Sequence, residues 1–137
     1  MADAWPATIA AALLRRGAMA HAMSSALTAA ALLGGVAAAL FDWRGVLPVA
    51  AVIVIAGLAE FWLAARVAID ADLFAALGDG DLARFDEGMR RLGLMPHHKA
   101  GRPLDERIRG ALRLLKLQVA LLAVQIAALL AAMVLVR

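Results

Sequence analysis

The sequence lacks several residue types that common protein chemistries need. Its 137 residues include no cysteine and no tyrosine, and aromatic residues make up only 5%. The absence of cysteine excludes disulfides, thiolate metal sites, haem attachment motifs and a cysteine nucleophile. Phosphate loops, dinucleotide glycine motifs, nucleophile elbows, zinc helix motifs and basic–aromatic interleaving for nucleic acid are absent too, so the sequence gives no positive indication of an enzyme.

Apolar residues are what the sequence has in excess. They form 64% of the chain, and the mean hydropathy is +0.82. Soluble proteins contain roughly 45–50% apolar residues, and a small soluble domain buries only part of its chain. A lipid bilayer removes that limit. Because the excess is mostly alanine, leucine and valine, the composition predicts an all-α integral membrane protein.

Three long runs contain little or no charge. A transmembrane helix needs about 20 predominantly apolar residues. Residues 17–41 and 117–136 carry no Asp, Glu, Lys or Arg, while residues 46–69 are interrupted by Glu60 and Arg66. These runs predict a polytopic membrane protein with three transmembrane helices. The expected segments are an interfacial helix in residues 1–19, spans at 20–40, 46–69 and 114–136, and a helical hairpin-like loop at 70–113.

The N-terminal segment has rival interpretations. Arg15 and Arg16 precede an apolar run, and residues 36–39 resemble a small-residue cleavage site, as in a secretory signal. The apolar run is longer than the apolar region of a typical signal peptide, and the flanking residues of a twin-arginine motif are missing. We therefore expect an uncleaved span. Residues 3–16, with Trp5, Ile9 and Leu13 at four-residue spacing, are either an interfacial helix or simply the start of this span.

Basic residues alternate between rich and poor segments along the chain. The N-terminal segment and the 70–113 loop are rich in Lys and Arg, whereas the turn at 41–45 has only Arg44 and the tail only Arg137. The positive-inside rule then predicts a cytoplasmic N-terminus, a cytoplasmic 70–113 loop and an outside C-terminus. Helical spans favour a bacterial inner (plasma) membrane.

The 70–113 loop contains an amphipathic helix, which Asp79 or Asp81 can cap and Gly93 can end. We expect ion pairs Asp86–Arg90 and Glu87–Arg91 on its polar face. The apolar stripe packs on the protein's own helices or on the membrane, or it docks a partner subunit. The stripe consists of Leu82, Phe85, Met89 and Leu92.

Polar residues recur within the predicted spans, all in the same half of the bilayer. Such groups are costly in lipid, so we expect them to face one another. In the structural interpretation, these groups form interhelical hydrogen bonds that fix the bundle. In the functional interpretation, they form a proton or ion relay, or a site for a quinone or a lipid head group, and His21 and Glu60 are the titratable members. The cluster comprises His21, Ser24, Ser25, Thr28, Glu60, Gln118 and Gln125.

Basic residues beside the spans predict contact with lipid head groups, or serve only as orientation determinants. They are Arg66, Arg102, Arg109, Arg113 and Lys116. The His97–His98 pair lacks the spaced ligands of a metal site, so no metal is predicted.

The leading functional hypothesis is a non-catalytic accessory, stabilising or assembly subunit of a larger membrane complex, or a homo-oligomer. The alternatives are a proton-, ion- or quinone-handling protein and an anionic-lipid-binding protein. No cofactor is predicted, although bound phospholipid is expected and quinone is an alternative ligand. Expected partners are membrane lipids and other membrane subunits or copies of the chain, and not nucleic acid.

Overall fold

The residues that the computed structural model describes, which are 4–77, 81–93 and 101–135, form helices joined by short connections and contain no strand. Three segments, Pro6–Leu40, Val46–Leu77 and Leu104–Val134, are long and apolar enough to cross a membrane. This confirms the prediction of an all-α protein with three potential transmembrane helices. The elements are α1 (Ala4–Arg15), α2 (Gly17–Leu40), α3 (Val46–Leu77), α4 (Leu82–Arg91) and α5 (Leu104–Leu135).

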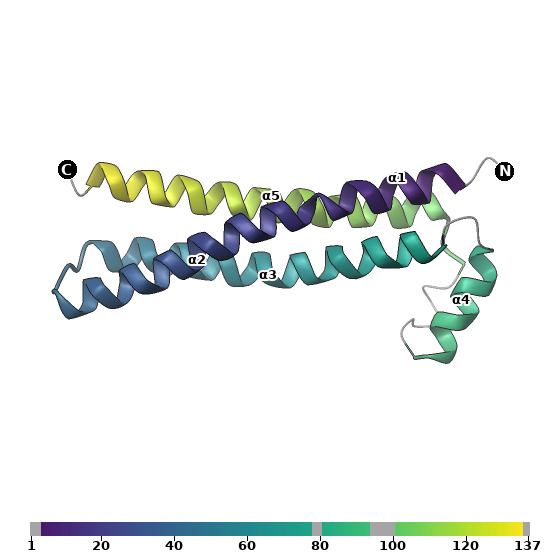
Figure 1. Cartoon of the computed structure of the whole chain (residues 1–137), viewed down its shortest axis with the longest axis horizontal. Coiled ribbons are helices and arrows are strands. Elements are labelled where there is room, and N and C mark those ends of the chain that lie inside the picture. The colour runs from purple at the N-terminus through teal and green to yellow at the C-terminus, as the bar shows by residue number, and fades with distance from the viewer. Residues whose placement is uncertain (1–3, 78–80, 94–100, 136–137) are drawn as a thin grey trace.

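The three long helices lie side by side, as Figure 1 shows, and α1 continues the direction of α2. Helix α3 packs against both α2 and α5, and α1 lies mainly against α3. Short α4 projects from one end of the bundle (Figure 1). We call this end the α4 end and the opposite end, where α2 meets α3, the turn end.

The connection between α2 and α3 is a tight turn. Trp43 N donates to Ala38 O at 2.8 Å, and Val46 N donates to Trp43 O at 3.1 Å. Asp42 has a φ of +58°, a left-handed conformation that Asp tolerates better than most residues. Because the turn is so short, α2 and α3 must be antiparallel neighbours.

Small side chains hold α1 against the bundle. Its inner face packs into a core cluster, and alanine in such a cluster lets helix backbones approach closely. Ile9 and Leu13, by contrast, are 52% and 48% exposed on the outer face. The core cluster consists of Ala10, Ala11, Leu14, Val67, Ala71, Phe74 and Ala111.

An ion pair fixes α4 to the start of α5. Arg107 donates to both carboxylate oxygens of Asp86, at 2.8 and 2.7 Å, and Gly101 N donates to the same carboxylate at 2.9 Å. The hydrogen bonds from Arg107 hold the pKa of Asp86 below its ordinary value. The expected Asp86–Arg90 pair is therefore wrong, because Asp86 faces α5; Arg90 pairs with Glu87 instead.

The ends of α4 follow the capping rules. Asp81 is the N-cap, and its side chain accepts a hydrogen bond from Ala83 N at 2.9 Å. Gly93 follows the helix with a φ of +68°, a conformation open to glycine. The expected Glu87–Arg91 pair is present at 2.8 Å. Asp79, the other proposed cap, lies outside the described residues.

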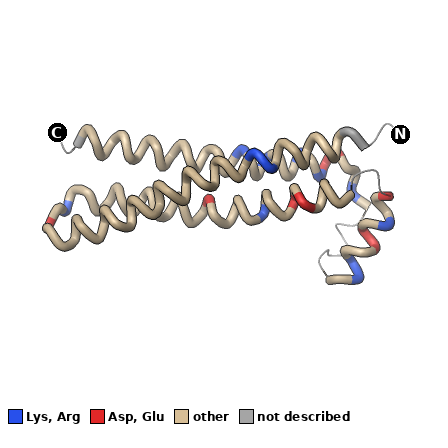
Figure 2. Tube along the Cα trace, viewed as in Figure 1, with Lys and Arg blue, Asp and Glu red and all other residues tan. Residues whose placement is uncertain are grey.

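Charged residues are concentrated toward the α4 end, and Figure 2 shows long uncharged stretches toward the turn end. In the sequence, residues 29–41, 46–59 and 126–136 contain no polar side chain. The described parts of these segments, 29–41, 46–59 and 126–135, form the half of the bundle next to the turn. The apolar part of α2 in this half is about 18 Å long, calculated from a rise of 1.5 Å per residue.

Candidate functional site

Glu60 lies inside the bundle although it interrupts an apolar helix. It shares one face of α3 with Gly57, Ala64 and Val67, at helical spacings of three and four residues, and all four are buried. Only 1% of Glu60 is exposed. The register of α3 therefore turns the carboxyl group away from lipid and toward α2 and α5.

Both carboxyl oxygens of Glu60 have a polar partner from another helix. His21 Nδ1 on α2 lies 3.0 Å from Oε2, and Gln118 Nε2 on α5 donates to Oε1 at 2.8 Å. The same amide nitrogen donates to Gly17 O at 2.9 Å. We call His21, Glu60 and Gln118 the inner cluster. It joins all three potential spans.

The proton of the inner cluster can be assigned to one side of Glu60. Gly17 O and Glu60 Oε1 are both acceptors toward Gln118, so the amide nitrogen of Gln118 must face them. The exchangeable proton then lies between Glu60 Oε2 and His21 Nδ1. The pair can exist as imidazolium with carboxylate or as imidazole with carboxylic acid. Both forms contain the same number of protons, so His21 and Glu60 are treated as one shared proton site. Its occupied form is neutral overall, which burial favours.

A second polar layer lies nearer the turn end. Gln125 Nε2 donates to Thr28 Oγ1 and to Ile53 O, both at 3.0 Å, and Thr28 Oγ1 donates to Ser24 O at 2.8 Å. We call Thr28 and Gln125 the outer cluster. Gln118 and Gln125 are seven residues apart, so the two layers are separated by about 10 Å along α5. These groups have no titratable member, and their contacts are those of an interhelical brace.

Gly57 makes room for the outer cluster. A Cβ atom at this position would collide with Thr28 Oγ1 and lie 2.8 Å from Gln125 Nε2. Gly17 does the same for the inner cluster, since a Cβ there would lie 2.9 Å from Gln118 Oε1. Each polar layer therefore needs a glycine beside it.

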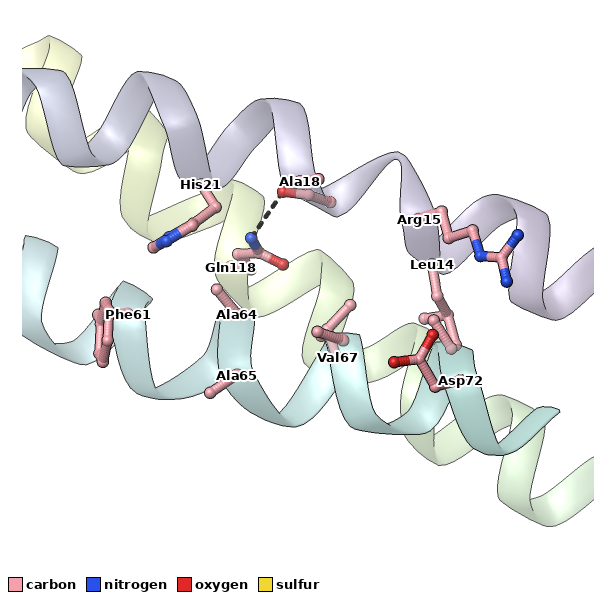
Figure 3. Close-up of a pocket in the computed structure, with 13 residues that line it drawn as sticks. Leu14, Arg15, Ala18, His21, Phe61, Ala64, Ala65, Val67, Asp72 and Gln118 are labelled. Carbon is pink, nitrogen blue, oxygen red and sulfur yellow. Dashed lines mark hydrogen bonds between the residues drawn. The ribbon is translucent and has the colours of Figure 1, made fainter. Parts of the chain in front are cut away.

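A groove runs from the inner cluster along the bundle in the direction of the α4 end. It has a volume of about 380 Å³ and is lined by residues of α1, α2, α3 and α5. Figure 3 shows His21 and Phe61 at one end of the groove, Gln118 between the helices, and Arg15 and Asp72 at the other end. The His21 side chain is 33% exposed, whereas that of Glu60 is 1% exposed. His21 thus connects the buried carboxyl group to the groove, which we call the His21 groove.

The predicted polar cluster is not one continuous group. The structure brings His21, Glu60 and Gln118 together, and separately brings Thr28 and Gln125 together. Ser24 is fully buried, and its Oγ has no hydrogen-bond partner among the described residues. Ser25 is exposed on the other side of α2. A step of one residue rotates a side chain by about 100°, which separates the two serines.

The predicted lipid and docking residues also fall into separate places. Arg66 and Arg102 border a groove between α3, α4 and α5, into which Leu82, Phe85 and Met89 also face. Leu92 is 72% exposed and does not line this groove. Arg109, Arg113 and Lys116 are exposed on α5, on the face opposite Ala111 and Gln118. His97 and His98 lie outside the described residues.

Three groups that shape the two polar clusters were not identified from the sequence. They are Gly17, Gly57 and the carbonyl group of Ile53. Gly57 lies one turn before Glu60 on the same face, and Gly17 lies one turn before His21, so helical spacing could have pointed to both. The Ile53 carbonyl has no sequence signal, because every residue carries one.

Comparisons with protein-family models, with curated proteins and with solved structures found no match. A fold by itself does not define a function, and here the fold is a set of packed membrane-length helices. The chemistry of the inner cluster and its groove is therefore the main guide to function.

Proposed function

We propose that this protein takes up and releases a proton within the membrane at the His21–Glu60 pair. One observation carries the proposal: a carboxyl group that is 1% exposed is joined at 3.0 Å to an imidazole that is 33% exposed on a groove wall. Ionisable residues inside a membrane are costly, and by default they point to a functional site such as a proton or ion pathway.

The three residues have distinct roles in this proposal. Glu60 stores the proton, and His21 transfers it between the groove and Glu60. With Nδ1 facing Glu60, His21 can accept a proton at Nε2 and pass the Nδ1 proton to Glu60 Oε2. Gln118 holds the other carboxyl oxygen through its 2.8 Å hydrogen bond and is a positioning residue.

Infrared spectroscopy of the protein in lipid tests this function. The band of a protonated carboxyl group should change in intensity when the pH of the medium is changed, because the His21–Glu60 pair then gains or loses a proton. Glu60→Gln should remove this band. Asp72→Asn is the control, because Asp72 is exposed at the far end of the groove and should leave the band intact.

His21→Gln separates a proton path from a structural contact. Glutamine can still donate to Glu60, so the bundle should remain folded. The carboxyl band should persist. The carboxyl proton should exchange with deuterium at about a tenth of the wild-type rate or more slowly still, because the imidazole relay is lost. A band that never responds to pH, or that exchanges equally fast in His21→Gln, contradicts the proposal.

A second proposal, that the chain is a subunit of a larger membrane assembly or of a homo-oligomer, has separate support. Between the outer cluster and the turn at Asp42, the described parts of the three long helices have no polar side chain, so a proton at Glu60 has no continuation toward the turn end. Passage across the membrane would need groups from another chain. Native mass spectrometry after gentle extraction should show a heteromeric or homomeric mass, and a monomer carrying only lipid would contradict this second proposal.

A further inference from the structure

The His21 groove is large enough to hold a small organic molecule. Its volume of about 380 Å³ lies within the usual range of ligand pockets, roughly 300–1,000 Å³. Most of its wall is made of small apolar residues, which are Gly17, Ala18, Ala64, Ala65, Ala68 and Ala71. Figure 3 shows the imidazole of His21 and the ring of Phe61 at one end of this wall. The groove can therefore take a mainly apolar ligand with one polar group near His21.

Loss of the shared proton leaves the groove with an uncompensated negative charge. Among the described residues, His21 and Glu60 are the ionisable groups at one end, and Arg15 and Asp72 are those at the other. Helix α5 contributes only the uncharged Gln118 to the groove. Without the shared proton, Glu60 and Asp72 carry two negative charges and Arg15 carries one positive charge. One negative charge remains, and a buried charge is costly unless it is paired.

No cation of the described chain compensates this charge directly. Glu60 forms its ion pair with His21 and none with Lys or Arg, and neither Arg15 nor Asp72 forms an ion pair with any described residue. A positively charged ligand near His21 would restore neutrality. A neutral ligand would leave the negative charge unpaired.

In the same deprotonated state, the groove presents a hydrogen-bond acceptor beside an aromatic ring. Neutral His21 donates from Nδ1 to the Glu60 carboxylate over the 3.0 Å contact, so its Nε2 atom is an acceptor. The ring centroids of His21 and Phe61 are 5.6 Å apart, and both side chains line the groove. The face of an aromatic ring attracts cations within about 6 Å of its centroid. A positively charged group that donates a hydrogen bond therefore suits both side chains.

We propose that the His21 groove binds a small amphipathic organic amine, in its ammonium form, when the His21–Glu60 pair has lost its proton. This inference rests on the proton uptake and release proposed above. The ammonium donates to His21 Nε2 and lies against the Phe61 ring, while the apolar part of the amine lies on the alanine wall. The ammonium keeps its own protons, and the proton of the pair passes to water. Amine binding and protonation of the pair therefore oppose each other by the same factor.

Calorimetric titration of the protein in lipid nanodiscs with 2-phenylethylammonium tests this inference, after subtraction of the signal from protein-free nanodiscs. The titration is run at two pH values within the range over which the infrared carboxyl band changes. We expect the affinity to fall by up to about tenfold for each unit that the pH is lowered, because binding displaces one proton. Two buffers of different ionisation enthalpy should report that proton. Amine binding without proton release overturns the inference.

An uncharged probe of nearly the same shape tests the need for a positive charge. 2-Phenylethanol should bind about tenfold more weakly than 2-phenylethylammonium or not at all, because it cannot compensate the charge of the pair. Equal binding of the alcohol and the ammonium overturns the inference.

Paired phenylalanine variants then locate the amine. Phe61→Leu should weaken binding about fivefold, because leucine keeps an apolar wall but loses the aromatic face. Phe41→Leu is the matched control, since Phe41 follows α2 at the turn end and does not line the groove. It should bind the amine as the wild type does. Full affinity in Phe61→Leu, or an equal loss in Phe41→Leu, overturns the assignment to this groove.

The infrared carboxyl band, measured without amine, separates failure of this inference from failure of the proposed function. A band that responds to pH in a protein that binds no amine overturns the amine inference alone. A band that never responds to pH overturns the proton site and this inference with it. Phe61→Leu should keep the response of the band to pH, because Phe61 touches the imidazole and not the Glu60 carboxyl group.

Discussion

At the scale of single residues, Gly57 sets how closely α2 and α5 approach α3. We predict that Gly57→Ala lowers the free energy of unfolding by about 1–3 kcal/mol, the usual cost of overpacking a tight contact. The new methyl group would meet Thr28 Oγ1 and Gln125 Nε2 and force the outer cluster apart. Unfolding in mixed micelles, followed by loss of helical circular dichroism, measures the change.

Gly34→Ala is the control for this prediction. Gly34 is exposed on α2, and a Cβ atom there would meet no atom within 4 Å. Alanine favours a helix over glycine by about 1 kcal/mol, so this variant should be as stable as the wild type or more stable. Equal destabilisation by both substitutions would show that close packing at Gly57 is not what matters.

The residues of the inner cluster could be predicted from the sequence, but their contacts could not. Glu60 and His21 stand out because they interrupt charge-free or apolar runs. Helical spacing places Ser24 and Ser25 near the same face, yet α2 turns only Ser24 inward. Which face meets which neighbour depends on helix rotation, and in an alanine-rich helix the weak contrast between faces leaves that rotation undetermined by the sequence.

At the scale of elements, the position of α4 depends on the Asp86–Arg107 ion pair. We predict that Asp86→Asn or Arg107→Gln releases α4, at a cost of about 2 kcal/mol, because each removes charge-assisted hydrogen bonds from groups that are mostly buried. Spin labels on cysteines introduced at Ala83 and Ala75 would report a broader distance distribution. The chain has no native cysteine to interfere.

Glu87→Gln is the matched control, because Glu87 is at the surface and its pairs with Arg90 and Arg91 contribute little. Its distance distribution should match that of the wild type. A distribution that broadens equally in Glu87→Gln would assign the docking of α4 to general surface charge instead of Asp86.

The same element should respond to acid. Since the bonds from Arg107 lower the pKa of Asp86 in the folded protein, this stabilisation is fully present above the ordinary value of 3.8 and is lost as pH falls through the lowered pKa. The label distances should therefore stay constant from neutral pH to about pH 4 and broaden in stronger acid. Broadening that is complete before pH 5 would contradict this assignment.

The extent of α4 could be predicted better than its attachment. Its cap at Asp81 and its end at Gly93 follow from local sequence rules, and so does the apolar face of Leu82, Phe85 and Met89. The bond from Arg107 to Asp86 joins residues that are 21 positions apart in the sequence. A local spacing rule favours Arg90 as the partner of Asp86 and cannot weigh a distant arginine.

At the scale of the whole molecule, charged residues are concentrated on the α4 side of Glu60, and the helices beyond the outer cluster are apolar as far as the turn at Asp42. Composition and the length of the apolar runs were enough to predict three membrane-length helices. The reason is that a bilayer requires each span to be a long and predominantly apolar run. We propose from the distribution of Lys and Arg that the α4 end faces the cytoplasm. A cysteine at Ala83 should react with a membrane-impermeant maleimide only in inside-out vesicles, and labelling in right-side-out vesicles would reverse this orientation.

One-sided proton exchange at Glu60 is the central claim, and a pH step on one face of oriented vesicles tests it most directly. The infrared carboxyl band that Glu60→Gln abolishes would be followed after acid or base is added to either side. We predict a response when the α4 end is exposed to the step, because the His21 groove runs from the inner cluster in that direction, and none when the step is on the turn end. A response from the turn end, or from neither side, would contradict the claim.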